Sequence, residues 1–353
     1  MGQGIRNQYY RIGRWNMTST LITILAALFV FGLLIIGHEL GHFTMAKAAG
    51  VPVLEFAFGM GPKLFGFTKG ETKYSVRLFP IGGYVKMLGE DDESTDPRAF
   101  CNQNPWKKLS IIIAGPFMNF VLAVLLFFFY CMNMGIIKPV IGGLEANYPA
   151  QQAGLQVGDR IVYADDTRIK EYEDLSSYID KSEGQEITLT VERSGETIKL
   201  PVKPVYDKEQ ERFMIGITYG YEKGNIIGSL KNGVMYTGTS IKELVVYLAG
   251  AFKGNVSLND VGGPVAIVKM SGQAAQAGIW TLLFFAGFLS INLGVMNLIP
   301  FPALDGGWVI ILLIEAIRGK KIDDNKVGII NLIGFSILMA FVVLVTYKDI
   351  FIR

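Results

Sequence analysis

The sequence predicts a polytopic α-helical membrane protein, with about four transmembrane helices, a β-rich membrane-associated loop and one inserted α+β domain. Half of the 353 residues are hydrophobic and only 18% are charged, which is too apolar for an ordinary soluble domain. Four stretches carry almost no charge, and each holds about 20 or more mainly apolar residues, enough to cross a hydrocarbon core of roughly 30 Å as a helix. A soluble, alternating pattern separates the second stretch from the third.

The four apolar stretches predict spans near residues 20–42, 110–132, 279–317 and 328–347. The first contains Glu39 as its only charged residue, and Asp305 is the only charged residue between Lys269 and Glu315. The second and fourth contain no charged residue before their flanking lysines. We expect the third span to be interrupted at Pro300 and Pro302, because proline cannot continue a helix. The first lacks a small-residue cleavage site and runs directly into polar residues, so we expect a retained span and not a signal peptide.

Basic residues predict the orientation. The segment 43–108 carries nine Lys and Arg residues and the short segment 318–327 carries four more. Cytoplasmic loops are enriched in these residues, so both segments are expected in the cytoplasm, although three arginines near the N-terminus oppose this assignment.

The net charge of +2 does not suggest a nucleic-acid partner, and two cysteines without a CxxC pattern imply no disulfide framework.

The soluble pattern lies at 138–206. "GDRIVYADDTRI" predicts two short strands around an Asp-Asp turn, "EDLSSYIDK" a short helix, and "QEITLTVERSGETIKLPVKP" a hairpin. The predicted organisation is an N-terminal segment 1–19, a first helix with its β loop at 20–108, a second helix at 109–137, the α+β domain at 138–206, a connector with an amphipathic helix at 207–278, and the last two membrane helices at 279–353.

The loop at 51–90 is apolar for a loop beside a membrane. "VPVLEFAFGMGPKLFGF" and "TKYSVRLFPIGGYVKML" predict β segments punctuated by glycine and proline. Irregular backbone at membrane depth must be buried in protein or line a wet cavity. This leaves two interpretations, a hairpin that dips toward a site in the membrane and a cytoplasmic hairpin packed on the helices.

The first span ends in "HELGHF", which holds both histidines of the chain. His38 and His42 are four residues apart and share one helix face, the spacing at which two imidazoles bind one Zn²⁺. Glu39 could reach a zinc-bound water and accept its proton, and Gly41 keeps the packing face narrow. Two core histidines bonded to backbone are the alternative. Unpaired polar groups inside an apolar span are costly, which favours the metal site.

A third ligand is required, and the sequence offers no third histidine. Asp305 is the candidate, because the span unwinds around it at "NLIPFPALDGGWVI" and the two glycines that follow permit a tight turn. A helix cap is the alternative role for this carboxylate. Two histidines and one aspartate leave a fourth position open for water or substrate, as in catalytic zinc sites, so the sequence predicts one Zn²⁺ per chain.

These residues and spacings together resemble the site-2 protease family of M50-type intramembrane zinc metalloproteases, and within it the bacterial RseP/RasP-type branch that carries PDZ domains. The resemblance covers most of the chain, in "HELGHF", "FGMGP", "PIGGYVKMLGE", "ANYPAQQAGLQVGDRIV", "GGPVAI" and "NLIPFPALDGG". The chain departs from the family in two places. It has room for one PDZ domain where some relatives have two, and Trp308 stands where relatives often have histidine.

The resemblance implies residue roles. His38, His42 and Asp305 would bind zinc, with Glu39 as the catalytic base. Substrate binding is implied for Asn297 and for the β-edge near "GGYVKM", at Gly82, Gly83 and Tyr84. A PDZ peptide loop is implied at "GLQVGD", with Gly154, Leu155, Gly158 and Asp159.

The resemblance also implies a biological setting. The chain would be a multi-pass protein of the bacterial cytoplasmic (inner) membrane, in contact with lipid, with an extracytoplasmic PDZ domain and an active site toward the cytoplasm. It would cleave single-span membrane proteins, either anti-sigma factors or remnant signal peptides, with an upstream site-1 protease among its possible partners. A non-catalytic PDZ membrane adaptor would not need Glu39, and a metal transporter would need a path of ligands instead of one convergent point.

Overall fold

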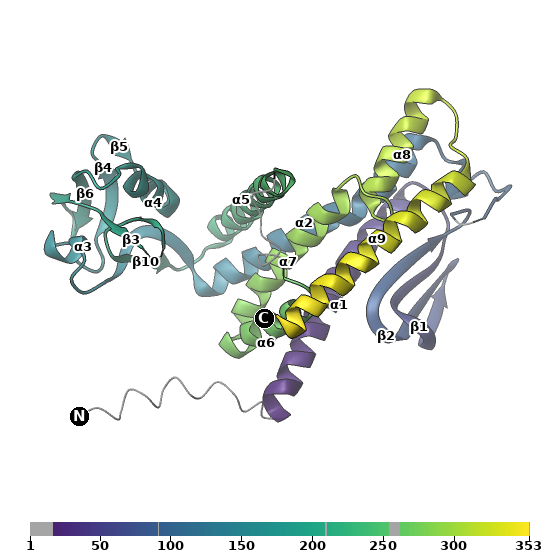
Figure 1. Ribbon diagram of the computed structural model, residues 1–353, viewed down its shortest axis with the longest axis horizontal. Coiled ribbons are helices and arrows are strands. Elements are labelled where there is room, and N and C mark those ends of the chain that lie inside the picture. Colours follow the sequence, from purple (N-terminus) through teal and green to yellow (C-terminus); the bar gives the residue numbers. More distant parts are fainter. Residues whose placement is uncertain (1–16, 91, 209, 254–261, 353) are drawn as a thin grey trace. The chain divides into compact units, whose positions relative to one another are not determined.

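The computed structural model describes residues 17–90, 92–208, 210–253 and 262–352 (Figure 1). The chain divides into two compact units. The membrane unit comprises the residues up to Phe128 and those from Gly233 onward, and the inserted unit comprises Phe129–Asn232. Each unit is described by itself.

Four helices of the described residues are long and apolar enough to cross a membrane, which confirms the predicted membrane protein. Three of them extend beyond their predicted boundaries at both ends: α1 (Met17–Ala48), α2 (Pro105–Met134) and α9 (Asp324–Phe351). The fourth, α7 (Ile279–Leu298), ends at the predicted break. Three further helices are α5 (Ile226–Phe252), α6 (Pro264–Ala277) and α8 (Asp305–Arg318), and a short 3₁₀ turn covers Phe100–Asn102.

The core of the membrane unit is formed where α1, α2, α6 and α7 meet. Val30 of α1, Leu126 of α2 and Ala286 of α7 are among its buried side chains. By contrast, α9 buries little surface and exposes large apolar side chains such as Leu332 at 65%. A contiguous apolar surface of this kind is stable when lipid covers it.

The third span is interrupted as predicted. α7 ends at Leu298 and α8 begins at Asp305, with Pro300 and Pro302 between them. The two glycines after Asp305 are required by close backbone contacts. A Cβ at Gly306 would lie 2.1 Å from the carbonyl oxygen of Ile299. The loop therefore folds back tightly onto the first turn of α8 and fixes where the Asp305 side chain starts.

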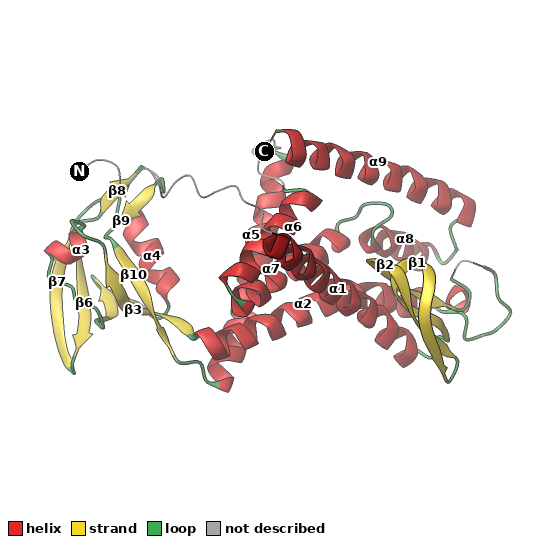
Figure 2. Cartoon of the chain, turned by 90° about the horizontal axis from the view of Figure 1, so that it is seen from below, coloured by secondary structure: helices red, strands yellow, loops and turns green. Residues whose placement is uncertain are grey.

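The predicted β segments after the first span form two long strands, β1 (Val53–Lys69) and β2 (Thr72–Met87), which pair with several irregularities in register. Residues 53–58 pair with 83–87 on one side and with 73–76 on the other, and 65–69 pair back onto 72–76. Figure 2 shows these strands as one curved sheet. We call the two strands together the hairpin.

The inserted unit is an α+β domain whose sheet has the order β10-β3-β4-β6-β7, with β5 pairing with β4 and a separate β8-β9 pair. Its strands are β3 (Ile136–Leu144), β4 (Arg160–Ala164), β5 (Thr167–Arg168), β6 (Ile187–Arg193), β7 (Glu196–Val202), β8 (Val205–Asp207), β9 (Arg212–Met214) and β10 (Ile217–Glu222). The short α3 (Pro149–Gln152) and the helix α4 (Tyr172–Lys181) complete it, and α4 flanks the sheet in Figures 1 and 2. The core packs Leu175 of α4 against Leu189 and Ile161 of the sheet.

The sheet of the inserted unit extends beyond the predicted boundary at residue 206, because β10 pairs with β3. Gly216, with a φ of +76°, lies between β9 and β10 and interrupts the apolar–polar alternation of "ERFMIGITYGYE", so the strand is hard to recognise in the sequence.

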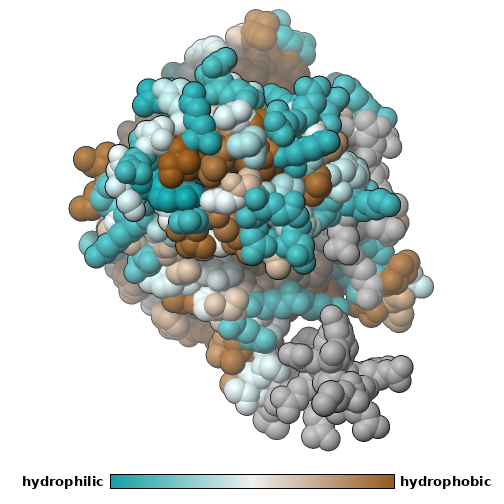
Figure 3. All heavy atoms as spheres, turned by 90° about the vertical axis from the view of Figure 1, so that its left-hand side faces the viewer, coloured by the Kyte–Doolittle hydropathy of each residue, from teal (hydrophilic) through white to brown (hydrophobic). Residues whose placement is uncertain are grey.

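The face of the molecule shown in Figure 3 carries mainly hydrophilic side chains with small apolar patches between them, as expected for a surface in water.

Candidate active site

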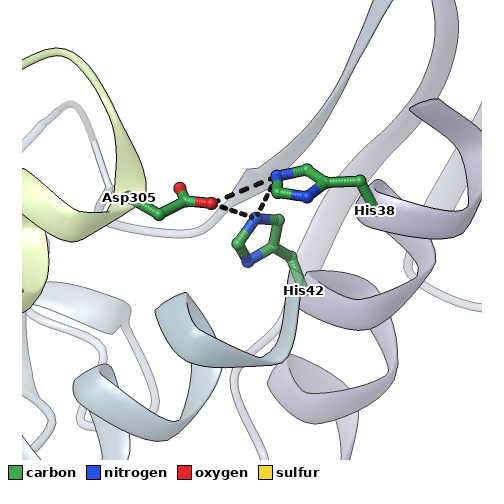
Figure 4. Close-up of side chains that lie close together, drawn as sticks. All are labelled: His38, His42 and Asp305. Atoms are coloured by element: carbon green, nitrogen blue, oxygen red, sulfur yellow. Dashed lines mark hydrogen bonds and ion pairs between the residues drawn. The ribbon is translucent and has the colours of Figure 1, made fainter. Parts of the chain in front are cut away.

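The two histidines of "HELGHF" lie one turn apart on α1 and direct their ring nitrogens toward each other (Figure 4). Nε2 of His38 is 3.2 Å from Nε2 of His42. The helix continues past both residues to Ala48, so the pair is held by regular backbone and not by a frayed terminus. This rigidity fixes the separation of the two nitrogens.

Asp305 enters the same point from the first turn of α8. Its Oδ2 is 3.1 Å from Nε2 of His38 and 3.6 Å from Nε2 of His42. The side chains of Asp305 and the two histidines are only 10–19% exposed. Oδ2 is nevertheless without a hydrogen bond of acceptable geometry. The three potential ligand atoms therefore lie within 4.8 Å of one another.

The donor set fits zinc. Two ligands bound to tetrahedral Zn²⁺ at about 2.0–2.1 Å are about 3.3 Å apart, and the three measured separations are 3.1, 3.2 and 3.6 Å. Imidazole nitrogen and carboxylate oxygen are also the ligand types that catalytic zinc sites use. Three protein ligands leave one position open for water or substrate.

The helix α2 supports the two histidines by a close approach to α1. A Cβ at Gly41 would lie 2.1 Å from the carbonyl oxygen of Ala114, and one at Gly115 would lie 2.3 Å from Nε2 of His42. Both positions therefore require glycine. This contact brings Nδ1 of His42 to 2.9 Å from the carbonyl oxygen of Ile111. A hydrogen bond donated by Nδ1–H leaves the lone pair of Nε2 available to a metal.

Asn119 of α2 contacts the other histidine. Its side-chain amide is 3.1 Å from Nδ1 of His38, and Asn119 is completely buried. Sequence analysis did not identify this residue. The sequence feature that could have identified it is a polar side chain in the uncharged second span, four residues after Gly115 and therefore on the same helix face.

Glu39 lies beside the histidines and next to the hairpin. Its carboxylate is close enough to interact electrostatically with His38, His42 and Asp305. A Cβ at Gly83 would lie 3.1 Å from Cγ of Glu39. The hairpin therefore runs directly past the acid, and a side chain at Gly83 would fit there only tightly.

A polar network inside the hairpin holds its shape. Oε1 of Glu55 accepts hydrogen bonds from Oγ of Ser75 at 2.6 Å and from Nη2 of Arg77 at 3.0 Å. Arg77 also donates to the hydroxyl of Tyr84 and to the carbonyl oxygen of Gly61. Burial alone would raise the pKa of Glu55, but these hydrogen bonds and the charge of Arg77 hold it below its usual value. The Tyr84 side chain is thus engaged within the hairpin.

The other predicted residues are not gathered at the metal cluster by any described contact. Asn297 lies in the last turn of α7, partly exposed, just before the break. In the inserted unit, Leu155 is 3% exposed in the core, and Asp159 bonds Arg193 through both oxygens at 2.7 Å. The PDZ peptide loop at Gly154–Asp159 therefore remains a prediction. A pocket of the same unit lies elsewhere, between α4 and the residues of β9 and β10.

Comparison with known proteins gives the family. The sequence model of peptidase family M50 matches residues 26–341. A putative zinc metalloprotease of Clostridium acetobutylicum is 46% identical, over 94% of this chain and 98% of its own. A probable protease eep of Enterococcus faecalis is 34% identical, over 93% and 98%. The chain belongs to peptidase family M50, the site-2 protease family, and it is a zinc metalloprotease of the membrane.

The regulator of sigma-W protease RasP of Bacillus subtilis is a further relative. It is 31% identical over 93% of this chain and 98% of its own, and the aligned length of 414 exceeds the 353 residues here. Among the solved structures that match part of the chain is a PDZ domain of an SdrC-like protein from Listeria monocytogenes. This match covers 23% of this chain and 86% of that one at 21% identity and a TM-score of 0.21, a likeness too low to support a conclusion.

The α1–α2 contact gives the first testable prediction. In Gly115→Ala the new methyl group would occupy the space of the His42 and His38 rings, so we expect the purified protein to lose most of its zinc. Gly328→Ala in α9 is the matched control, because a Cβ there meets nothing within 4 Å; it should keep full zinc. Zinc content per chain, measured by elemental analysis, checks both. Equal zinc in Gly115→Ala and wild type would contradict the assigned contact.

Proposed function

We propose that the protein is an intramembrane zinc endopeptidase that cleaves single-span membrane proteins. His38, His42 and Asp305 hold the zinc and Glu39 acts as general base. The observation that carries this proposal is the convergence of three potential metal ligands from apolar helices, with Oδ2 of Asp305 buried and without a hydrogen-bond partner and with a fourth polar group, Glu39, beside them. The family membership supports the metal and the reaction type.

The depth of the cluster supports cleavage within the membrane. His38 lies ten residues before the end of α1 at Ala48, which corresponds to roughly 15 Å along the helix axis, and about 20 mainly apolar residues precede it. The hairpin follows the same helix, because a Cβ at Gly32 would lie 3.3 Å from the ring of Phe58. Of the two interpretations of the loop, these contacts favour a hairpin that dips toward the site.

The chemistry requires a positioned base and an accessible carbonyl group. Zinc, when bound, polarises a peptide carbonyl and lowers the pKa of a bound water to near 7. Glu39 accepts the proton of the attacking water and donates it to the leaving amine. His38 and His42 remain neutral ligands, and the Nδ1 atom of His42 stays occupied by the Ile111 carbonyl oxygen. Asp305 supplies a negative charge that offsets the charge of the metal.

The hairpin supplies a place for the substrate backbone. A helical substrate shields its peptide bonds, so the scissile segment must be extended before hydrolysis, and strand addition to a sheet edge holds a peptide in that state. Residues 83–87 pair on one side with 53–58, and the described strand pairing assigns them no second neighbour. Because Gly83 adjoins Glu39, a strand added at Gly82, Gly83 and Tyr84 would lie next to the base. Asn297 would bind the substrate backbone at the end of α7.

The distribution of basic residues and the relatives support a proposed cellular setting. We place residues 43–108 in the cytoplasm and the inserted unit, as a PDZ domain, outside the bacterial inner membrane, where it filters substrates by their outer domains. We propose anti-sigma factors and remnant signal peptides as the two substrate classes, with an upstream site-1 protease as a candidate partner. The printed name of one relative, regulator of sigma-W protease, favours the first class.

The role of Glu39 is tested by Glu39→Gln. Glutamine keeps the shape of the side chain but cannot accept the proton, while the three ligands remain. We expect full zinc content and cleavage reduced by about 10²–10⁴-fold, the usual contribution of a positioned general base. Asp305→Asn should instead lose zinc and activity together. Both are measured as zinc content and single-turnover cleavage on one preparation in detergent. Cleavage by Glu39→Gln that is restored by added zinc would overturn the base assignment.

The orientation is tested by thiol labelling of intact cells. Cys101 is partly exposed, whereas Cys131 is completely buried. An impermeant maleimide should label Cys101 only after the membrane is opened. Thr197→Cys, an exposed position of β7, should be labelled from outside in the same cells and serves as the positive control. Labelling of Cys101 in sealed cells would reverse the topology.

A further inference from the structure

We infer that Asn119 is a positioning residue for the metal, and that its side-chain carbonyl oxygen accepts a hydrogen bond from Nδ1–H of His38. This inference rests on the proposed function, because it concerns how His38 presents its other nitrogen to zinc. Nothing in the family match or the names of the relatives assigns a role to Asn119.

The Asn119 side chain and the His38 ring are within hydrogen-bonding distance in a largely buried place. The Asn119 amide lies 3.1 Å from Nδ1 of His38, and Asn119 is completely buried. The two ends of an amide have nearly the same shape, so packing fixes the position of the group while the hydrogen-bond chemistry decides which end faces the ring. One end of this amide has a partner in the ring, and Oδ1 as placed has none.

The tautomer of the His38 ring decides which end of the Asn119 amide faces it. A neutral imidazole carries one N–H, and the other nitrogen is the acceptor or metal ligand. If the amide N–H faced Nδ1, the hydrogen of His38 would sit on Nε2. That atom lies 3.1 Å from Oδ2 of Asp305 and 3.2 Å from Nε2 of His42, in the centre of the donor cluster. A ring in this tautomer cannot bind zinc there. With the amide oxygen facing the ring, Nδ1 carries the hydrogen and the Nε2 lone pair points into the cluster.

The same device serves both histidines from one face of α2. Ile111, Gly115 and Asn119 are spaced by four residues and so lie in line on the helix. The carbonyl oxygen of Ile111 holds Nδ1 of His42, Gly115 makes room for both rings, and the Asn119 oxygen holds Nδ1 of His38. α2 thus supplies one acceptor for each ligand. Ser290 of α7 donates to the backbone carbonyl of Asn119 at 2.8 Å and anchors this part of α2.

The test compares two substitutions of similar size in the full-length protein. Asn119→Leu removes the acceptor, and we expect zinc affinity to fall about 10–100-fold, the usual effect of losing the group that orients a metal-bound histidine. Asn119→Asp keeps an oxygen that can only accept, so affinity should remain within a few-fold of wild type. If the amide N–H were the partner, it would hold the ring in the tautomer that cannot bind zinc, so removing it in Asn119→Leu would not lower zinc affinity. Affinity is measured by competition with a zinc chelator.

Controls separate this inference from protein folding and from the proposed function. Asn119→Leu and the smaller Asn119→Ala should reach one zinc per chain at saturating zinc and then recover cleavage, which a misfolded protein would not. Ser290→Ala disturbs the α2–α7 contact but keeps the acceptor and should bind zinc like wild type. An equal loss in Ser290→Ala, or unchanged affinity in Asn119→Leu, overturns the inference. Retention of zinc by Asp305→Asn would instead refute the proposed ligand set.

Discussion

The close approach of α1 and α2 at Gly41 and Gly115 is the contact on which the site depends. Any larger residue at these positions would collide with backbone or with a histidine ring. Because the helices touch there, the Ile111 carbonyl and the Asn119 amide come within hydrogen-bonding distance of the two rings. The histidines would otherwise turn their Nδ1 atoms into an apolar environment, which costs free energy for each unpaired group.

The metal cluster and the hairpin meet on α1. The same helix turn that carries His38 and His42 also carries Glu39, and Gly83 of the hairpin lies against Glu39. A substrate strand held by the hairpin edge and a water activated at the metal would therefore share one side of α1. The hydrogen bonds from Ser75 and Arg77 to Glu55 join the two strands of the hairpin.

Sequence analysis predicted the membrane spans, the break before Asp305 and the three candidate ligands, because each rests on a local pattern. Apolar length, two prolines followed by a diglycine, and a four-residue spacing are all visible in the chain. It did not identify Asn119 or the Ile111 carbonyl, since their role depends on how α2 packs against α1 and backbone acceptors leave no sequence signal. β10 was also missed, because its pairing with β3 joins residues that are far apart in the sequence. The substrate and PDZ residues came from resemblance alone and remain predictions.

X-ray absorption spectroscopy at the zinc edge of the purified full-length protein tests the central claim most directly. The account predicts a first shell of nitrogen and oxygen only, at about 2.0–2.1 Å, with the outer-shell scattering of two imidazole rings. It also predicts that this signature disappears in His42→Ala. A sulfur shell at about 2.3 Å, which would come from a cysteine, or an unchanged spectrum in His42→Ala would contradict the assignment of the zinc to His38, His42 and Asp305.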